Sequence, residues 1–290
     1  DGVIIEQGYN TETTGNGAGI KLSYASVSFA NVWFRDNYAY NGGAVSGDAY
    51  SKPTFFNSIF SSNSSMRYGG AVWANDHMEF TNCVFYGNST NDRGGAIDNA
   101  ASKTFVNVNN SIAWANTSGS NPNFYAIQAK NCLVEGGYPG IEIILNNPLF
   151  LNAEGNDFRL NATSPAIDAG NSSLLPEGAL TDFSGAPRIQ GTRVDMGVFE
   201  GGIVAPSPAS PANNEVISPI PDEVELRWQW PGDTPANVLS YIVEYSVNDA
   251  SVTTIKDIDK ELLSQTISGF NAADMVKWRV AAVTGLVEKH

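Results

Sequence analysis

The chain has 290 residues, 42% of them hydrophobic, and a formal net charge of −14 at pH 7. This acidic balance argues against a nucleic-acid partner, because binding to phosphates requires clustered Lys and Arg. No segment approaches the run of about 18 apolar residues that a membrane-spanning helix needs, so we expect no transmembrane segment. The 28 glycines, together with abundant Asn and Ser, predict many turns and few helices.

Two short phrases recur in phase in the first half of the chain. The first, Gly-Gly-Ala followed by Val or Ile, repeats at steps of 25, 27 and 25 residues. Its copies are residues 17–20 (where the phrase reads Gly-Ala-Gly-Ile), 42–45, 69–72 and 94–97, with an echo at 124–127. The second, Asn-x-x-Phe-x-x-Asn, occupies residues 31–37, 57–63 and 82–88, has Ala for Phe at 110–116, and begins again at Asn131.

These phrases predict a solenoid. About 25 residues with short strands and no helical period form one coil, whose apolar side is buried only by stacking on the next coil. We therefore expect an all-β fold in which residues 1–146 form parallel β-helix coils, best defined from residue 17 onward. The crossover rule makes this β-helix right-handed.

The same register predicts which residues share a column. Phe34, Phe60 and Phe85 should stack in the interior at the spacing of paired strands, about 4.8 Å. Cys83 and Cys132 share a column but lie two coils apart, about 10 Å, so we expect two free thiols. An amide ladder is expected along the Asn that opens each second phrase, namely Asn31, Asn57, Asn82, Asn110 and Asn131.

The paired phrases over residues 17–116 resemble the repeats of chlamydial polymorphic outer-membrane proteins, which are surface adhesins. Related repeats also occur in secreted bacterial β-helix proteins. The resemblance implies a parallel β-helix and an extracellular or bacterial cell-surface location. The chain opens in what reads as the middle of a strand, so we expect the natural N-terminus and any export signal to lie upstream.

The pattern changes at residues 147–202. Four phrases in this segment, at 157–160, 164–170, 181–188 and 194–200, resemble the choice-of-anchor Q domain of exported bacterial proteins. Its charged residues could pair with one another while the segment seals the open end of the solenoid. Alternatively, Asp168, Asp182 and Asp195 could hold calcium, which prefers several oxygen ligands. Calcium is the only cofactor that the sequence suggests.

A proline-rich linker is expected at 203–214, followed by a second domain at 215–290. Alternating apolar residues predict strands at 224–230, 241–247, 264–267 and 276–283. This Trp- and Tyr-rich strand pattern resembles a fibronectin type III sandwich that is truncated at its last strand. Such domains are spacers or adhesive modules, so no chemistry is expected there.

Candidate functional residues are those that face outward from the coils. The residue four positions after each first Gly defines one outward column, Lys21, Ser46, Trp73, Asp98 and, by the echo, Gln128; the residue six positions after it defines a second, Ser23, Asp48, Asn75, Ala100 and Lys130. Trp73 could stack on a sugar ring, with Asp48, Asp76, His77 and Asp98 as neighbouring ligand-binding residues. A polar solvated face with a turn histidine is the alternative interpretation.

Two functional hypotheses follow. The first is an exported, surface-associated and non-catalytic β-helix protein that acts in adhesion or glycan binding, as a monomer. The alternative is a polysaccharide lyase or glycoside hydrolase. A hydrolase needs two carboxylates a suitable distance apart, and Asp48, Asp76 and Asp98 are the candidates.

Overall fold

The computed structural model describes residues 2–12, 15–100, 105–190, 192–203, 207–211, 223–229, 238–248, 250–271 and 274–284. The chain divides into two compact units, Asp1–Gly202 and Ile203–Glu288. The regular secondary structure of the described residues is almost entirely β-strand, and these residues include no helix long and apolar enough to cross a membrane.

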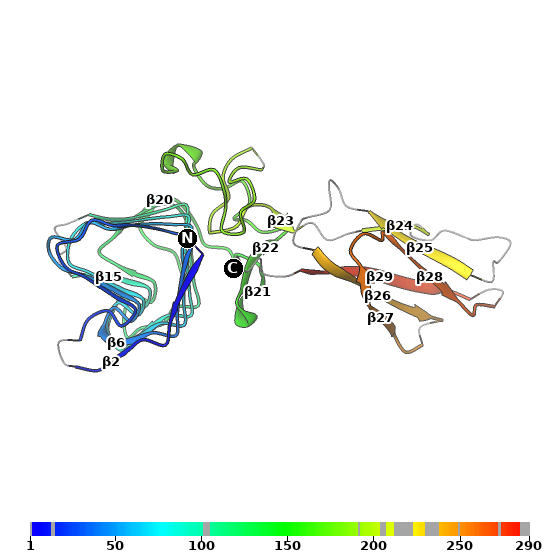
Figure 1. Ribbon diagram of the computed structural model, residues 1–290, viewed down its shortest axis with the longest axis horizontal. Coiled ribbons are helices and arrows are strands. Elements are labelled where there is room, and N and C mark those ends of the chain that lie inside the picture. Colours follow the sequence, from blue (N-terminus) through cyan, green and yellow to red (C-terminus); the bar gives the residue numbers. More distant parts are fainter. Residues whose placement is uncertain are drawn as a thin grey trace. The chain divides into compact units, whose positions relative to one another are not determined.

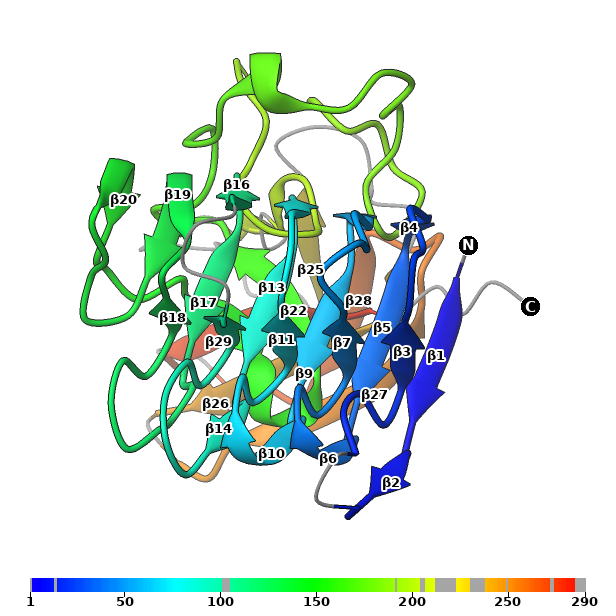
Figure 2. The ribbon, with the colours of Figure 1, turned by 90° about the vertical axis from the view of Figure 1, so that its left-hand side faces the viewer.

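The first unit is a parallel β-solenoid whose coils superimpose in Figure 1 and lie side by side in Figure 2. The coils contribute strands to four rows. The β11 row contains β3 (Ile20–Leu22), β7 (Val45–Gly47), β11 (Val72–Ala74), β15 (Ile97–Asn99) and β18 (Phe124–Tyr125). The β12 row contains β4 (Ser28–Ala30), β8 (Thr54–Phe56), β12 (Met78–Thr81) and β16 (Val106–Asn109).

The remaining two rows complete each coil. The β13 row contains β1 (Val3–Glu6), β5 (Val32–Arg35), β9 (Ile59–Ser61), β13 (Val84–Tyr86) and β17 (Ile112–Trp114). The β10 row contains β2 (Tyr9–Asn10), β6 (Tyr38–Asn41), β10 (Ser64–Tyr68) and β14 (Ser89–Thr90). The long strand β19 (Gln128–Val134) pairs with both β16 and β17, and β20 (Gly140–Ile144) pairs with β19. The predicted parallel coils are confirmed.

The predicted phenylalanine column is also confirmed. The rings of Phe34 and Phe60 stack with centroids 4.9 Å apart, and those of Phe60 and Phe85 are 4.8 Å apart. A parallel column of Phe29, Phe55 and Phe80 packs beside it, again at 4.9 Å. Cys83 and Cys132 are buried free thiols, as expected, and burial raises the pKa of each to about 12.

Glycine is required where the β11 row begins. Gly42 has φ +60°, and a Cβ there would lie 2.7 Å from the backbone N of Trp73 in the next coil. At Gly43 a Cβ would lie 2.5 Å from the carbonyl oxygen of Gly70. Any side chain would therefore prevent the coils from approaching to the spacing of paired strands.

The predicted amide ladder forms at a different asparagine. The Asn that closes each second phrase is buried in the interior, where Asn37 Nδ2 donates to Asn63 Oδ1 at 2.9 Å and Asn63 Nδ2 to Asn88 Oδ1 at 3.0 Å. Asn88 continues the ladder to Asn116 at 2.9 Å, and Asn116 to Asn123 at 2.9 Å.

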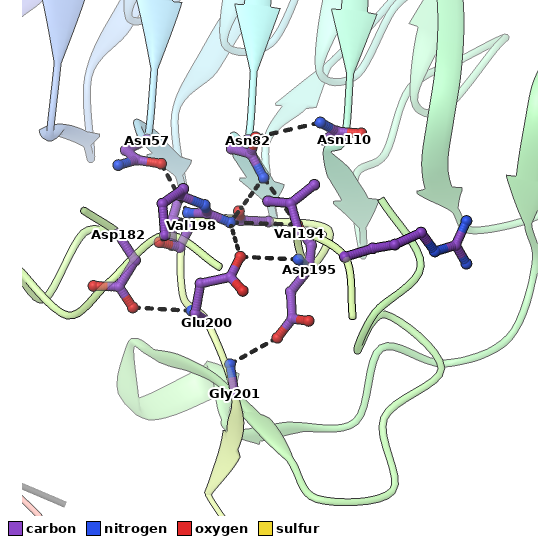
Figure 3. Close-up of polar contacts among 12 residues, drawn as sticks. Asn57, Asn82, Asn110, Asp182, Val194, Asp195, Val198, Glu200 and Gly201 are labelled. Atoms are coloured by element: carbon purple, nitrogen blue, oxygen red, sulfur yellow. Dashed lines mark hydrogen bonds and ion pairs between the residues drawn. The ribbon is translucent and has the colours of Figure 1, made fainter. Parts of the chain in front are cut away.

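The asparagines that open the phrases keep one link of the predicted ladder, from Asn110 Nδ2 to Asn82 Oδ1 at 3.5 Å, but their main role is a different one. Asn31, Asn57, Asn82, Asn110 and Asn131 all have φ between +46° and +54° and form the corner between the β12 and β13 rows. Left-handed φ is tolerated best by Gly and Asn, which explains why Asn recurs there. Nδ2 of Asn57, Asn82 and Asn110 each donates to a backbone carbonyl of the segment that follows the coils. Figure 3 shows where these three asparagines lie and the bond from Asn110 to Asn82.

That following segment, residues 147–201, is the cap. Its elements are β21 (Phe150–Asn152), the 3-10 helix η1 (Ala153–Gly155), β22 (Asp157–Asn161) and the 3-10 helix η2 (Ser172–Leu174), with β23 (Gly202–Ile203) after it. Apolar cap side chains pack on the outer face of the β13 row, which the cap covers along several coils rather than sealing the open end of the solenoid as we expected. The shared buried cluster contains Trp33, Ile59, Val84, Ile112 and Leu133 from the coils, and Phe158, Leu160, Ala166, Met196, Val198 and Phe199 from the cap.

The second unit consists of two three-stranded antiparallel sheets around one core. One sheet has the order β24 (Ser207–Ser210), β25 (Glu223–Gln229), β28 (Ser264–Ser268); the other has β27 (Thr253–Asp259), β26 (Val238–Val247), β29 (Val276–Thr284). Trp228 of the first sheet packs edge-on against Tyr241 of the second with centroids 5.1 Å apart. Residues 207–210, expected in the linker, form the edge strand β24; residues 204–206, 212–222 and 230 of the predicted linker and strands lie outside the described residues.

Candidate functional site

The outward residues of the β11 row form one column across five strands. Lys21, Ser46, Trp73 and Asp98 pair in register, as predicted. The fifth member is Tyr125, which pairs with Asp98, and not Gln128, which pairs with Asn107 in the β12 row. The echo at 124–127 misplaced this residue because Phe124, rather than Ile127, occupies the interior position beside Ile97.

Asp98 lies in this outward column but is fully buried, which corrects the expectation that it faces solvent. Its Oδ2 accepts a 2.7 Å hydrogen bond from Nε of Arg93 within an ion pair. Burial raises the pKa of Asp98 above its usual value, although the bond from Arg93 opposes this effect. For Arg93, partial burial lowers the pKa, but the hydrogen bond and charge of Asp98 outweigh it, so that the pKa is raised.

Aromatic rings enclose the guanidinium that covers Asp98. The Cζ atom of Arg93 lies 4.5 Å from the ring centroid of Tyr68 and 4.2 Å from that of Tyr125. Such cation–π contacts hold the guanidinium in place without neutralising it. We call Tyr68, Trp73, Arg93, Asp98 and Tyr125 the Trp73 cluster. Four of its members are half-buried, and only Asp98 is fully buried.

Two polar atoms of the Trp73 cluster lack a hydrogen-bond partner among the residues that the structure describes. They are the indole Nε1 of Trp73, a donor, and Oδ1 of Asp98, an acceptor, and both are buried. The two residues pair in register on neighbouring strands. An unpaired buried donor or acceptor costs about 1–3 kcal/mol, so this pair is a place where a ligand hydroxyl, which both donates and accepts, would be stabilised.

Asp48 has a structural role at the corner that follows β7. Its Oδ2 accepts from the Ser23 hydroxyl at 2.5 Å, and its Oδ1 accepts from the backbone N–H groups of Tyr24 and Tyr50 and from the Ser51 hydroxyl. Led by the Ser23 bond, these contacts lower the pKa of Asp48 to about 2. A carboxylate held ionised in this way is a poor general acid.

Asp76 and His77 lie at the same corner in the next coil. Nδ1 of His77 is 2.6 Å from Oδ1 of Asp76, and the imidazole is exposed. Burial raises the pKa of Asp76, but its bonds with His77 prevail and the pKa is lowered. Asp76 is itself nearly buried, whereas His77 is solvated at a turn.

The three calcium candidates accept hydrogen bonds from the cap backbone. Asp195 accepts from the N–H groups of Asp168 and Gly201, at 2.6 and 2.7 Å, and Asp182 accepts from that of Glu200 at 2.9 Å (Figure 3). Asp168 accepts from Arg193 N–H at 2.9 Å. Within the described part of the chain, no group of three or more His, Cys, Asp or Glu side chains could hold a metal ion. Calcium binding stays a prediction.

A buried arginine joins these carboxylates to the coils. Nη1 of Arg188 donates to Asn57 Oδ1 at 2.8 Å, and Nη2 lies 2.8 Å from Oε1 of Glu200. Both charged side chains are almost completely buried. Burial lowers the pKa of Arg188 and raises that of Glu200 to about 7. These contacts attach the cap to the coils. Arg188 Nε and Glu200 Oε2 are buried without a hydrogen-bond partner among the described residues.

The structure thus brings Trp73 and Asp98 together and leaves Asp48, Asp76 and His77 at the adjoining corner. Sequence reasoning missed Tyr68, Arg93 and Tyr125. Two of them could have been found from the repeat. Tyr68 and Arg93 each directly precede the first Gly of a Gly-Gly-Ala phrase, so the register places them in one column. The arrangement offers aromatic rings, a fixed guanidinium and unpaired hydrogen-bonding atoms, which is the chemistry of binding rather than proton transfer.

Comparison with known proteins supports the repeat. Residues 82–100 match the Chlamydia polymorphic membrane protein repeat. The matched stretch contains one second phrase, β13, β14 and the Gly-Gly-Ala-Ile copy that leads into β15. Searches of curated proteins and of solved structures gave no significant match. The match and the stacked strands together support a β-helix repeat protein, and are compatible with a surface or extracellular location.

Proposed function

We propose that this chain is a surface repeat protein that binds a glycan, without catalysis, through the Trp73 cluster on the outer face of the β11 row. The observation that carries the proposal is the unpaired donor of Trp73 and the unpaired acceptor of Asp98, on residues that pair in register on neighbouring strands. A sugar presents hydroxyls that satisfy both atoms and an apolar ring face that packs on the rings of Trp73 and Tyr125.

Binding is favoured over hydrolysis by the state of the carboxylates. Asp48 is ionised and accepts four hydrogen bonds, while Asp98 is buried in an ion pair with Arg93. Neither arrangement provides an acid and a base that face each other across an open groove, as glycoside hydrolysis requires.

The rest of the chain is proposed to serve export and presentation. Residues 147–202 would be a choice-of-anchor Q-like cap, supported by the sequence phrases quoted above. The second unit would be a fibronectin type III-like spacer, supported by its two three-stranded sheets that share a core with Trp228 and Tyr241. In this arrangement the solenoid is the binding element, and adhesion to a glycan-bearing surface is its role.

The test is a panel of neutral and acidic polysaccharides, assayed for binding and for released product. Trp73→Phe, which keeps an aromatic ring but removes the indole N–H, and Asp98→Asn should each weaken binding about tenfold, corresponding to about 1.4 kcal/mol. Tyr9→Ala, which removes an exposed ring in the β10 row, is the control and should have no effect. Absence of binding to every polysaccharide, or an equal loss in the control, would overturn the proposal; product release would favour a lyase or hydrolase.

A further inference from the structure

The corner between the β11 and β12 rows varies in length from coil to coil, as does the corner between the β10 and β11 rows, which spans residues 42–44, 69–71 and 91–96. The segments that join the β11 row to the β12 row are residues 23–27, 48–53, 75–77 and 100–105, of which 101–104 lie outside the described residues. By contrast, the asparagine corner between the β12 and β13 rows is residue 31, 57–58, 82–83 and 110–111. In repeat proteins, a corner whose loops vary commonly marks a binding side, because loops there can change without disturbing the stack.

Exposed aromatic side chains gather at this variable corner. Tyr24 and Tyr50 are 76% and 63% exposed, and Phe105 is 53% exposed. The imidazole of His77 is 47% exposed. These four residues come from four successive coils, and we call them the aromatic edge. Exposing several large rings on one edge to water is unfavourable. A cluster of this kind indicates a binding site more strongly than single exposed apolar residues do.

The rings of the aromatic edge are held in pairs. Tyr24 and Tyr50 stack with centroids 4.7 Å apart and an interplanar angle of 9°. His77 and Phe105 lie 5.9 Å apart at 55°. The first pair is fixed from below by Asp48, which accepts the Tyr24 N–H at 3.2 Å and the Tyr50 N–H at 3.1 Å. Tyr24 adopts φ +53°, an unfavourable conformation for a Tyr that these contacts maintain.

We propose that the aromatic edge is a second binding site, which takes a neutral oligosaccharide chain lying along the solenoid axis across several coils. The ligand class rests on the proposed function, but none of the residues belongs to the Trp73 cluster. Each Tyr supplies an apolar ring and a hydroxyl, which match the CH face and hydroxyls of a sugar. The preformed Tyr24–Tyr50 stack reduces the ordering cost of binding.

The dimensions and charge of the aromatic edge define the ligand further. Three coil steps of about 4.8 Å separate Tyr24 from Phe105, so a ligand that contacts the whole edge must be at least about 14 Å long. A monosaccharide is too short, and a chain of several sugars is required. Asp48 stays ionised beneath the tyrosines and Asp76 adds a second carboxylate, while Lys52 in the same corner adds one positive charge. The negative charges outnumber the positive one, so anionic polysaccharides would be disfavoured.

The experiment is calorimetric titration of the full chain with neutral glucan and mannan oligosaccharides, from the monosaccharide to the hexasaccharide, and with uronic-acid oligomers of equal length. We expect affinity to rise with chain length and the uronic-acid series to bind more weakly. The Tyr24→Ser, Tyr50→Ser double variant should lose at least about tenfold in affinity for the long neutral chains. Tyr24→Phe with Tyr50→Phe should retain most of it, because the rings remain.

The matched control is Tyr9→Ser, since Tyr9 is 75% exposed and stacks on Tyr38 with centroids 5.3 Å apart, but lies in the β10 row. Length-independent affinity, an unchanged double variant or an equal loss with Tyr9→Ser overturns the aromatic edge as a site. If Trp73→Phe weakens binding while the double variant does not, only this inference fails. If the wild-type chain binds no glycan, the proposed function fails and the aromatic edge fails with it.

Discussion

Raising the pH from about 5 to about 8 is expected to destabilise the first unit chiefly through the side chain of Glu200. Burial raises the pKa of Glu200 from 4.5 to about 7, even though Arg188 opposes this. Between these two pKa values the folded chain holds a proton that the unfolded chain has released. The free energy of unfolding therefore has its full Glu200 contribution below about pH 4.5 and loses it as the pH rises through about 7. At 1.36 kcal/mol per pH unit, the loss is about 3 kcal/mol.

The measurement is unfolding of the full chain, by calorimetry or denaturant, at several pH values across this window. Glu200→Gln, which has no carboxyl to titrate, should remove most of the pH dependence. Glu154→Gln, at an exposed glutamate of the cap, should preserve it. Burial also raises the pKa of Asp195 and of Asp98, so some pH dependence of the same sign will remain in both variants. Identical pH profiles for wild type and Glu200→Gln would refute the assignment of the titration to Glu200.

Three further outcomes are expected. Phe60→Ala should cost about 3–5 kcal/mol in denaturant unfolding, because the ring is fully buried between Phe34 and Phe85; a loss under about 1 kcal/mol would show that the column does not stabilise the coils. Asn63→Leu should cost about 3 kcal/mol or more in the same assay, because it leaves buried amides on both sides without partners, and a neutral effect would contradict the ladder. Cys83 and Cys132 should resist an aromatic disulfide reagent in the native protein and both react in denaturant, since burial raises the pKa of each thiol to about 12; rapid native reaction would show that the coils open readily.

The coils could be predicted from the sequence because stacking makes the sequence periodic. Gly42, Gly69 and Gly94 recur at corners where only glycine fits, and the Phe that fills the interior recurs with them. Periodicity alone, however, cannot say which of two recurring asparagines points inward. Asn57 and Asn63 repeat with the same step, yet the first turns outward at a left-handed corner and the second enters the interior.

The candidate site was only partly predictable. Outward positions follow from the register, which placed Trp73 and Asp98 in one column. Burial of Asp98 depends on Arg93, five residues earlier across the Gly turn, and nothing in the spacing indicates that this side chain folds back. The position of the cap on the side of the coils could have been predicted from the sequence. Ile59 beside Phe60, and Val84 beside Phe85, place apolar residues on both faces of one strand, which indicates that both faces are covered.

The cap has a consequence for how the first unit unfolds. In a solenoid each coil touches only its neighbours, so coils can detach one at a time from either end. Here the cap forms hydrogen bonds to Asn57, Asn82 and Asn110 in three successive coils and covers apolar residues from Trp33 to Leu133. If an end coil detached, the cap would lose its contacts with that coil. Its contacts with the middle coils would be weakened as well, because the same cap segment makes both. A stack of coils without the cap would unfold gradually from its ends. With the cap bound along several coils, we expect the first unit to unfold cooperatively.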